Sequence, residues 1–164
     1  MPRLSIVGAL IALVGCETVE APARPSPLPI MGDWMVFFDS GRSTLTETAS
    51  AAVRQLAAAA ARYELDIQID AHTDSVGSRQ ANLALSCRRA ESIRQALVEF
   101  GISARRIDVR ARGDTQPIVQ IGPGVAEPQN RRAEMYLGRN NKSRIPDPCA
   151  TIGVPPSPPK PNTP

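Results

Sequence analysis

Apolar residues recur along this chain with two different periods, and each period predicts a different kind of element. Short stretches that are apolar throughout, or that alternate apolar with polar residues, are typical of β-strands with a buried face. Longer stretches that repeat apolar residues at spacings of three and four are typical of amphipathic helices. We therefore expect strands at residues 34–38, 65–71, 107–112 and 133–137, and helices at residues 44–63 and 79–100.

Both predicted helices carry local signals at one end. Thr44 and Glu47 have the spacing of a capping box, which would open the first helix. Gly101 follows the second helix and can adopt the left-handed conformation that ends one. The order of elements predicts an α/β (α+β) two-layer sandwich. In this fold two main helices cover one face of a mixed sheet of about four strands, and the other face is largely polar.

The first residues have the pattern of an export signal. Arg3 precedes an apolar run from Leu4 to Val14, which is too short for a membrane-spanning helix of about 20 residues. The run ends in Leu-Val-Gly-Cys16, which resembles a lipobox, where the cysteine thiol carries diacylglycerol after cleavage. We expect a signal peptide at residues 1–15 and lipidation at Cys16, and by resemblance to bacterial lipoproteins Glu17 after the cysteine implies export to the outer membrane. The alternative is an ordinary secretory signal with an incidental cysteine.

Prolines concentrate on both sides of the predicted fold. Of the 16 prolines, four lie between Pro22 and Pro29 and eight between Pro146 and Pro164. Proline-rich segments favour extended chain with little folded structure. We expect an acylated tether at residues 16–32, a single domain at residues 33–140 and a disordered tail at residues 141–164.

Charge and composition restrict the partners. The net charge is +3, aromatic residues make up 4% of the chain, and there is no run rich in lysine and arginine. These values argue against nucleic-acid binding, which uses stacking platforms and dense positive charge. A weakly basic protein is compatible with an acidic polymer of the cell wall.

The most specific pattern lies between Ile69 and Ala90. His72-Thr73-Asp74 is followed on the predicted helix by Asn82, Leu85-Ser86 and Arg89-Ala90. Together with VFFDS at residues 36–40 and NRRAE at residues 130–134, it resembles the OmpA-like peptidoglycan-binding domain over residues 33–137. The resemblance implies an OmpA-like fold in a lipid-anchored outer-membrane protein that faces the periplasm, binds peptidoglycan and tethers the membrane to the cell wall.

The resemblance also implies a ligand and a charge pair that holds it. The ligand would be the meso-diaminopimelate of the stem peptide, with its ammonium on Asp74 and its carboxylate on Arg89. Arginine presents a planar fork that matches a carboxylate, and an ionised aspartate accepts hydrogen bonds from an ammonium. Asn82, Ser86 and Arg89 stand at i, i+4 and i+7, so they share one side of the helix, beside its buried stripe.

Other residues would complete this site. Thr73 and Asn82 would add hydrogen bonds that orient the ligand, and Arg131 would line the same cleft. Arg132 is one residue further along, so it would point the other way if a strand has begun.

Each of these residues has an alternative reading. Asp74 would equally suit a helix cap, and Arg89 alone would suit a solvated helix position. The chain also departs from the family at Ala71, usually glycine, and at Ala81, usually aromatic. These departures keep open an envelope assembly or structural lipoprotein that binds a protein partner through the same fold, and other envelope proteins remain candidate partners.

An enzyme is the competing class of function. His72, Asp74 and Ser75 are polar neighbours, but catalytic triads are assembled from residues that are distant in sequence. The chain has one histidine and no closely spaced cysteine pair, which supplies a zinc site poorly. We expect no enzymatic activity, no cofactor and no metal.

With Cys16 acylated, Cys87 and Cys149 remain in an oxidising compartment. These two cysteines could form a disulfide between the second helix and the tail, because they are an even pair in an oxidising compartment. Cys87 also falls on the apolar stripe of that helix, where it would serve as a small buried hydrophobe. The sequence leaves both readings open.

Overall fold

The computed structural model describes residues 34–138 and Cys149. The predicted signal peptide at residues 1–15, the tether at residues 16–32 with Cys16, and the tail apart from Cys149 lie outside the described residues. Within the described part, no helix is both long enough and apolar enough to cross a membrane.

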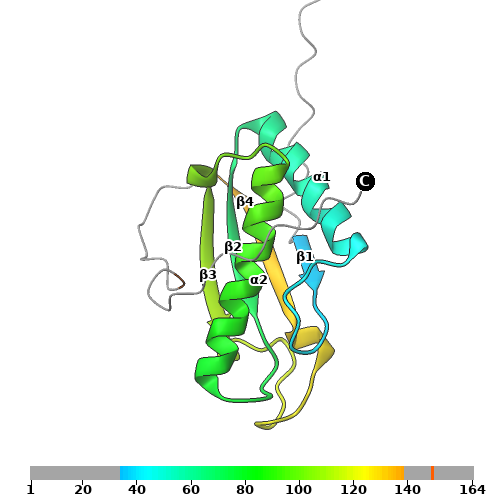
Figure 1. The fold of residues 1–164 in the computed structure, drawn as a ribbon, viewed down its shortest axis with the longest axis vertical. Coiled ribbons are helices and arrows are strands. Elements are labelled where there is room, and N and C mark those ends of the chain that lie inside the picture. The colour runs from blue at the N-terminus through cyan, green and yellow to red at the C-terminus, as the bar shows by residue number, and fades with distance from the viewer. Residues whose placement is uncertain (1–33, 139–148, 150–164) are drawn as a thin grey trace, which may run out of the picture.

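Four strands form one mixed sheet, and two helices lie on the same face of it (Figure 1). The sheet order is β1-β4-β2-β3, where β2 and β3 run parallel and β4 runs antiparallel to both of its neighbours. The strands are β1 (Trp34–Phe37), β2 (Asp66–His72), β3 (Ile107–Gly113) and β4 (Arg132–Gly138), and the helices are α1 (Glu47–Tyr63) and α2 (Arg79–Glu99). The two-layer fold predicted from the periodicity is thereby confirmed.

The core lies between the helices and the sheet. Alternate residues of the strands point into it, as the period of two requires. The fully buried side chains of this core include Val53 and Leu56 of α1, Ile93 and Leu97 of α2, Ile67 and Ile69 of β2, and Met135 of β4. The opposite face of the sheet carries polar residues such as Asp70, Arg112 and Glu134, as expected.

The helix ends correct one prediction and confirm another. The first helix begins two residues later than the capping box suggested, because the hydroxyl of Thr46, not Thr44, accepts the hydrogen bond from the Ala49 backbone N–H at 3.2 Å. Glu47 is then the first helical residue. Gly101 adopts a φ of +90° after α2, as predicted for a left-handed cap.

One glycine brings β3 against the start of α2. Gly113 has a φ of +56°, and a Cβ atom there would lie 3.3 Å from the backbone nitrogen of Leu83. The Gly113 backbone N–H donates to the Ser86 hydroxyl at 3.0 Å, and its carbonyl accepts from the Thr73 backbone N–H at 2.9 Å. The end of β2, the end of β3 and the first turns of α2 are thus held together, and the candidate site lies at this junction.

Candidate functional site

Asp74 lies in the loop that connects β2 to α2. The cap of α2 is Ser78, whose hydroxyl accepts from the Ala81 backbone N–H at 3.2 Å, so the helix does not use Asp74 as its cap. Asp74 is 6% exposed. Its Oδ2 atom accepts from Arg131 Nη1 at 3.2 Å, whereas its Oδ1 atom accepts no hydrogen bond from the described residues.

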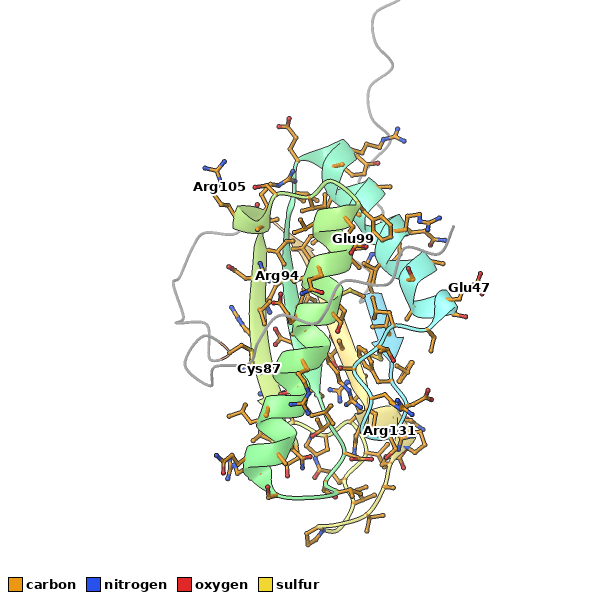
Figure 2. All side chains as sticks on the ribbon, in the orientation of Figure 1. Glu47, Cys87, Arg94, Glu99, Arg105 and Arg131 are labelled. Carbon is orange, nitrogen blue, oxygen red and sulfur yellow. A yellow bond between two sulfur atoms is a disulfide. The ribbon has the colours of Figure 1, made fainter. Side chains whose placement is uncertain are left out.

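Arg131 comes from a distant part of the chain, between the 3-10 turn Pro128–Asn130 and β4. Its Nε atom donates to the carbonyl of Phe38 at 3.2 Å, its Nη1 atom reaches Asp74, and its Nη2 atom has no hydrogen-bond partner among the described residues. The sequence predicts that Arg131 lines the same cleft as Asp74, and the structure brings its Nη1 atom to 3.2 Å from Oδ2 of Asp74. Arg132 turns away, as predicted, and its Nε atom donates to Glu134 Oε1 at 2.6 Å. Figure 2 shows the side chain of Arg131 at one end of the molecule.

Arg89 lies differently from the sequence expectation. Asn82, Ser86 and Arg89 do share one side of α2, but that side is buried, and Arg89 is 0% exposed. Its guanidinium donates to three backbone carbonyls, those of Arg42 at 2.9 Å, His72 at 2.7 Å and Asp39 at 3.1 Å.

The charge of Arg89 is held in a confined environment. The centre of its guanidinium lies 4.9 Å from the centroid of the Phe38 ring, which is a favourable cation–π contact. Burial lowers the pKa of Arg89 to about 10, although the nearby Asp74 carboxylate opposes that shift. Arg89 therefore stays protonated at neutral pH and joins the loop after β1 to the end of β2.

Two further predicted residues lie at the site with unused polar atoms. Thr73 and Asn82 are 2% and 3% exposed. The Thr73 hydroxyl and the Asn82 Nδ2 atom have no hydrogen-bond partner in the described structure. Ser86, by contrast, donates to the Leu83 carbonyl at 2.8 Å and accepts from Gly113, so both of its capacities are used.

Sequence reasoning gave no role to two residues that shape the surroundings. The Asn130 side chain accepts from the backbone N–H groups of Ile118 and Val119 at 2.9 and 3.0 Å, and donates to the Val119 carbonyl at 2.9 Å. The Ser75 hydroxyl lies 3.0 Å from the Gly122 carbonyl and 3.2 Å from that of Val125. Together they fasten the loop between β3 and Pro128. Asn130 is the first residue of the NRRAE block, so the family pattern in the sequence could have pointed to its role.

His72 is buried on the polar face of the sheet. It is 2% exposed, and neither of its ring nitrogens has a hydrogen-bond partner among the described residues. Burial, together with the positive charge of Arg132, lowers the pKa of His72 to about 4. The Ser75 hydroxyl bonds to carbonyls and not to this imidazole, so no activated serine is assembled here. The described residues contain no cluster of metal-ligating side chains.

Cys87 and Cys149 are joined by a disulfide in the structure, with their Cα atoms 5.4 Å apart. Cys87 is fully buried on α2, so it is both a core residue and a bonded one. The bond attaches Cys149 to the helix that also carries Asn82 and Arg89. Figure 2 labels Cys87 on this helix.

Comparisons with known proteins agree with this fold. The chain matches the model of the OmpA family over residues 37–131. An outer membrane protein of Gluconacetobacter diazotrophicus is 35% identical over 111 residues, covering 63% of this chain but only 29% of that protein. A peptidoglycan-associated lipoprotein of Mesorhizobium japonicum is 28% identical over 153 residues, covering 83% of this chain and 91% of that protein.

A solved structure is also similar. The crystal structure of the peptidoglycan-associated lipoprotein from Burkholderia pseudomallei superposes with a TM-score of 0.58 at 28% sequence identity. The match covers 63% of this chain and 88% of that one.

Proposed function

This chain belongs to the OmpA family, and from that premise we propose that it is an outer-membrane lipoprotein that binds peptidoglycan non-covalently and tethers the outer membrane to the cell wall. The names of its relatives, an outer membrane protein and a peptidoglycan-associated lipoprotein, support a role in the cell envelope. The proposed ligand is the meso-diaminopimelate residue of the stem peptide, which presents an ammonium and a carboxylate.

The observation that carries the proposal is a group of unused polar atoms around Asp74. A buried polar atom without a partner costs about 1–3 kcal/mol, so a ligand that supplies partners gains that free energy on binding. The buried donors without a partner are the hydroxyl of Thr73 and Nδ2 of Asn82. Oδ1 of Asp74 and Nη2 of Arg131 also have no hydrogen-bond partner among the described residues, but they are not fully buried. An acceptor beside cationic and neutral donors is the complement of a zwitterion.

In the proposed complex the ligand ammonium donates to Asp74, and its carboxylate faces the arginine side of the site, formed by Arg89 and Arg131. Thr73 and Asn82 fix the orientation of the ligand through neutral hydrogen bonds. Charge-assisted bonds of this kind are roughly twice as strong as neutral ones, which makes the two ends of the zwitterion the main source of affinity.

Binding is tested with the full chain carrying Cys16→Ala, a change intended to keep the protein in solution. We expect it to co-sediment with purified sacculi that contain diaminopimelate, in a saturable manner. The soluble tripeptide L-Ala-γ-D-Glu-meso-diaminopimelate should compete with the sacculi. Absence of co-sedimentation at protein concentrations up to hundreds of micromolar would contradict the proposed function.

The lipid anchor is a separate part of the proposal. Acylation needs the thiol of Cys16, and two or more acyl chains give the stable attachment that a single chain does not. Radiolabelled palmitate should enter the protein with Cys16 and not the Cys16→Ala variant. Equal incorporation by both would contradict the anchor while leaving peptidoglycan binding intact.

We also propose that the protein binds peptidoglycan without cleaving it. The Ser75 hydroxyl is directed to the carbonyls of Gly122 and Val125, and an activated nucleophile requires a hydrogen bond to a base. Incubation with labelled sacculi should therefore release no soluble muropeptides. Release that disappears in Ser75→Ala would assign a hydrolase instead.

A further inference from the structure

We infer that the loop between β3 and β4 positions Asp74 and Arg131 relative to each other, through hydrogen bonds to their neighbours in the chain. Residues 118–130 form this positioning loop. The inference rests on the proposed function and adds to it the residues that set the distance between the two charges before a ligand arrives. In Figure 1 the positioning loop lies, in yellow, at the end of the molecule where α2 begins.

Asn130 closes the positioning loop on itself. Its side chain accepts from the backbone N–H groups of Ile118 and Val119 at 2.9 and 3.0 Å, and donates to the Val119 carbonyl at 2.9 Å. Asn130 is 1% exposed, so these bonds are protected from water. Because Arg131 directly follows Asn130, its backbone is fixed relative to the closed loop.

Ser75 attaches the tip of the positioning loop to the chain beside Asp74. The Ser75 hydroxyl lies 3.0 Å from the carbonyl of Gly122 and 3.2 Å from that of Val125. The Ser75 carbonyl accepts from the backbone N–H of Gly124 at 3.1 Å. Because Ser75 directly follows Asp74, the same loop holds the chain next to both members of the charged pair.

Hydrogen bonds, and not burial, keep the positioning loop in this place. The buried core of the described residues includes no side chain from residues 118–129, and most of these residues are exposed. A segment with few buried apolar contacts opens easily unless hydrogen bonds hold it. Loss of the Ser75 hydroxyl should therefore release the tip of the loop while the core of the domain stays intact.

The benefit of positioning is a gain in affinity. Asp74 and Arg131 are 57 positions apart in the sequence, yet Arg131 Nη1 lies 3.2 Å from Asp74 Oδ2. If the two chain segments could move apart, a ligand would have to restore their spacing as it binds, and ordering them would reduce the free energy of binding. Ser75 and Asn130 are thus positioning residues, which act through Asp74 and Arg131.

The test replaces a hydroxyl by a methyl group of similar shape. Ser75→Thr keeps a hydroxyl at the tip of the loop, whereas Ser75→Val has a methyl group in its place. Calorimetric titration of the full chain carrying Cys16→Ala gives dissociation constants for the tripeptide L-Ala-γ-D-Glu-meso-diaminopimelate. We expect Ser75→Val to bind roughly fivefold more weakly than the unaltered site, and Ser75→Thr to bind as the unaltered site does. The midpoint of urea denaturation should be the same for all three proteins.

Thr115 offers a matched control just before the positioning loop. Its exposed hydroxyl donates to the Arg112 carbonyl at 2.7 Å, so Thr115→Val makes the same chemical change away from Ser75 and should leave the affinity unchanged. Amide deuterium exchange gives a second measurement. The N–H of Gly124, which donates to Ser75, should exchange faster in Ser75→Val and not in Thr115→Val. If Ser75→Val does not fold, Ser75→Ala removes the same hydroxyl and takes its place.

The outcomes separate this inference from the proposed function. If the unaltered site binds the tripeptide and Ser75→Val binds it equally well, the positioning role is wrong and peptidoglycan binding stands. The same conclusion follows if Ser75→Val and Thr115→Val lose affinity equally, or if Ser75→Val loses stability along with affinity. If the unaltered site binds neither the tripeptide nor sacculi, the proposed function itself is overturned, and the positioning role with it.

Discussion

Asp70 and Asp74 lie four residues apart, and both pair with an arginine, yet their surroundings differ. Asp70, on the polar face of the sheet, uses both carboxylate oxygens. Its Oδ2 atom accepts from Nε and Nη2 of Arg112 at 3.2 and 2.9 Å, and its Oδ1 atom accepts from Gln68 at 2.9 Å. Asp74 accepts one hydrogen bond, at 3.2 Å, and its other oxygen has no partner among the described residues.

The contrast lies in the carboxylates and not in every neighbouring group, because both ring nitrogens of His72 and Nη1 of Arg132, on the polar face, also lack hydrogen-bond partners among the described residues. On the polar face, Glu134 accepts from Arg132 at one oxygen and from the Tyr136 hydroxyl at the other. Around Asp74, the Thr73 hydroxyl, the Asn82 amide nitrogen and one nitrogen of Arg131 lack partners. A carboxylate with both oxygens used is part of the fold, whereas one with an oxygen to spare is suited to a ligand. Ion pairing alone does not distinguish the two.

The largest expected effect on stability comes from Arg89. Arg89→Ala removes the donor for three carbonyls and leaves a cavity, so we expect a loss of about 3–5 kcal/mol in the free energy of unfolding. Arg88→Ala, which changes the exposed neighbour on the same helix, should change that free energy by no more than about 0.5 kcal/mol. Urea denaturation followed by circular dichroism measures both. Equal stability of the two variants would show that the buried contacts of Arg89 do not hold the loop after β1 to the end of β2.

A second effect concerns pH and the polar face. The groups around His72 are Asp70 of β2, Arg112 of β3, and Arg132 and Glu134 of β4. The pKa of His72 is about 4 in the folded protein and 6.5 for an ordinary histidine, as in the unfolded chain. Between pH 4 and 6.5 the unfolded chain therefore binds more protons than the folded protein does. The stability linked to His72 is therefore fully present above pH 6.5 and is lost as the pH falls toward 4.

The loss of unfolding free energy that is linked to protonation of His72 is on the order of 3 kcal/mol. It should appear as a steeper decline in unfolding free energy between pH 6.5 and 4 for the native chain than for His72→Gln, which cannot titrate in that range. Parallel declines in the two proteins would show that His72 is not held neutral by its burial.

A smaller effect is expected from Asp70. Asp70→Asn keeps the shape of the side chain but removes the charge that Arg112 neutralises, and the side chain of Arg112 is 30% exposed. We expect a loss of roughly 1–2 kcal/mol in stability. The affinity for sacculi should not change, because no polar capacity near Asp74 is altered. Weaker binding by a folded Asp70→Asn would extend the site to the polar face.

The periodicity of the sequence predicted the fold because alternation and helical repeats report directly on burial. It placed all four strands and both helices, with the second helix running to within one residue of its observed end. The cap of α1 was wrong because Thr44 and Thr46 both carry a suitable hydroxyl, and only the path of the chain after β1 selects Thr46.

The site was predicted in part. Its residues came from a family pattern, from which Arg131 was expected to line the same cleft as Asp74. The burial of Arg89 was not expected, because it depends on two carbonyls from the loop after β1 and one from the end of β2, and no spacing along one helix reports where those carbonyls converge. The direct hydrogen bond between Asp74 and Arg131 also depends on the path of the whole chain, because the two residues are 57 positions apart in the sequence.

The most direct measurement compares Asp74→Asn with Asp70→Asn in binding to sacculi, using the full chain with Cys16→Ala. Both changes replace one carboxylate by the isosteric amide beside an arginine. If the spare oxygen of Asp74 receives the ligand ammonium, Asp74→Asn should lose roughly 30-fold or more in affinity while retaining its circular dichroism spectrum. Asp70→Asn should bind as the unaltered protein does. Equal binding by the two variants, or a loss confined to Asp70→Asn, would contradict the assignment of Asp74 as the ligand-binding carboxylate.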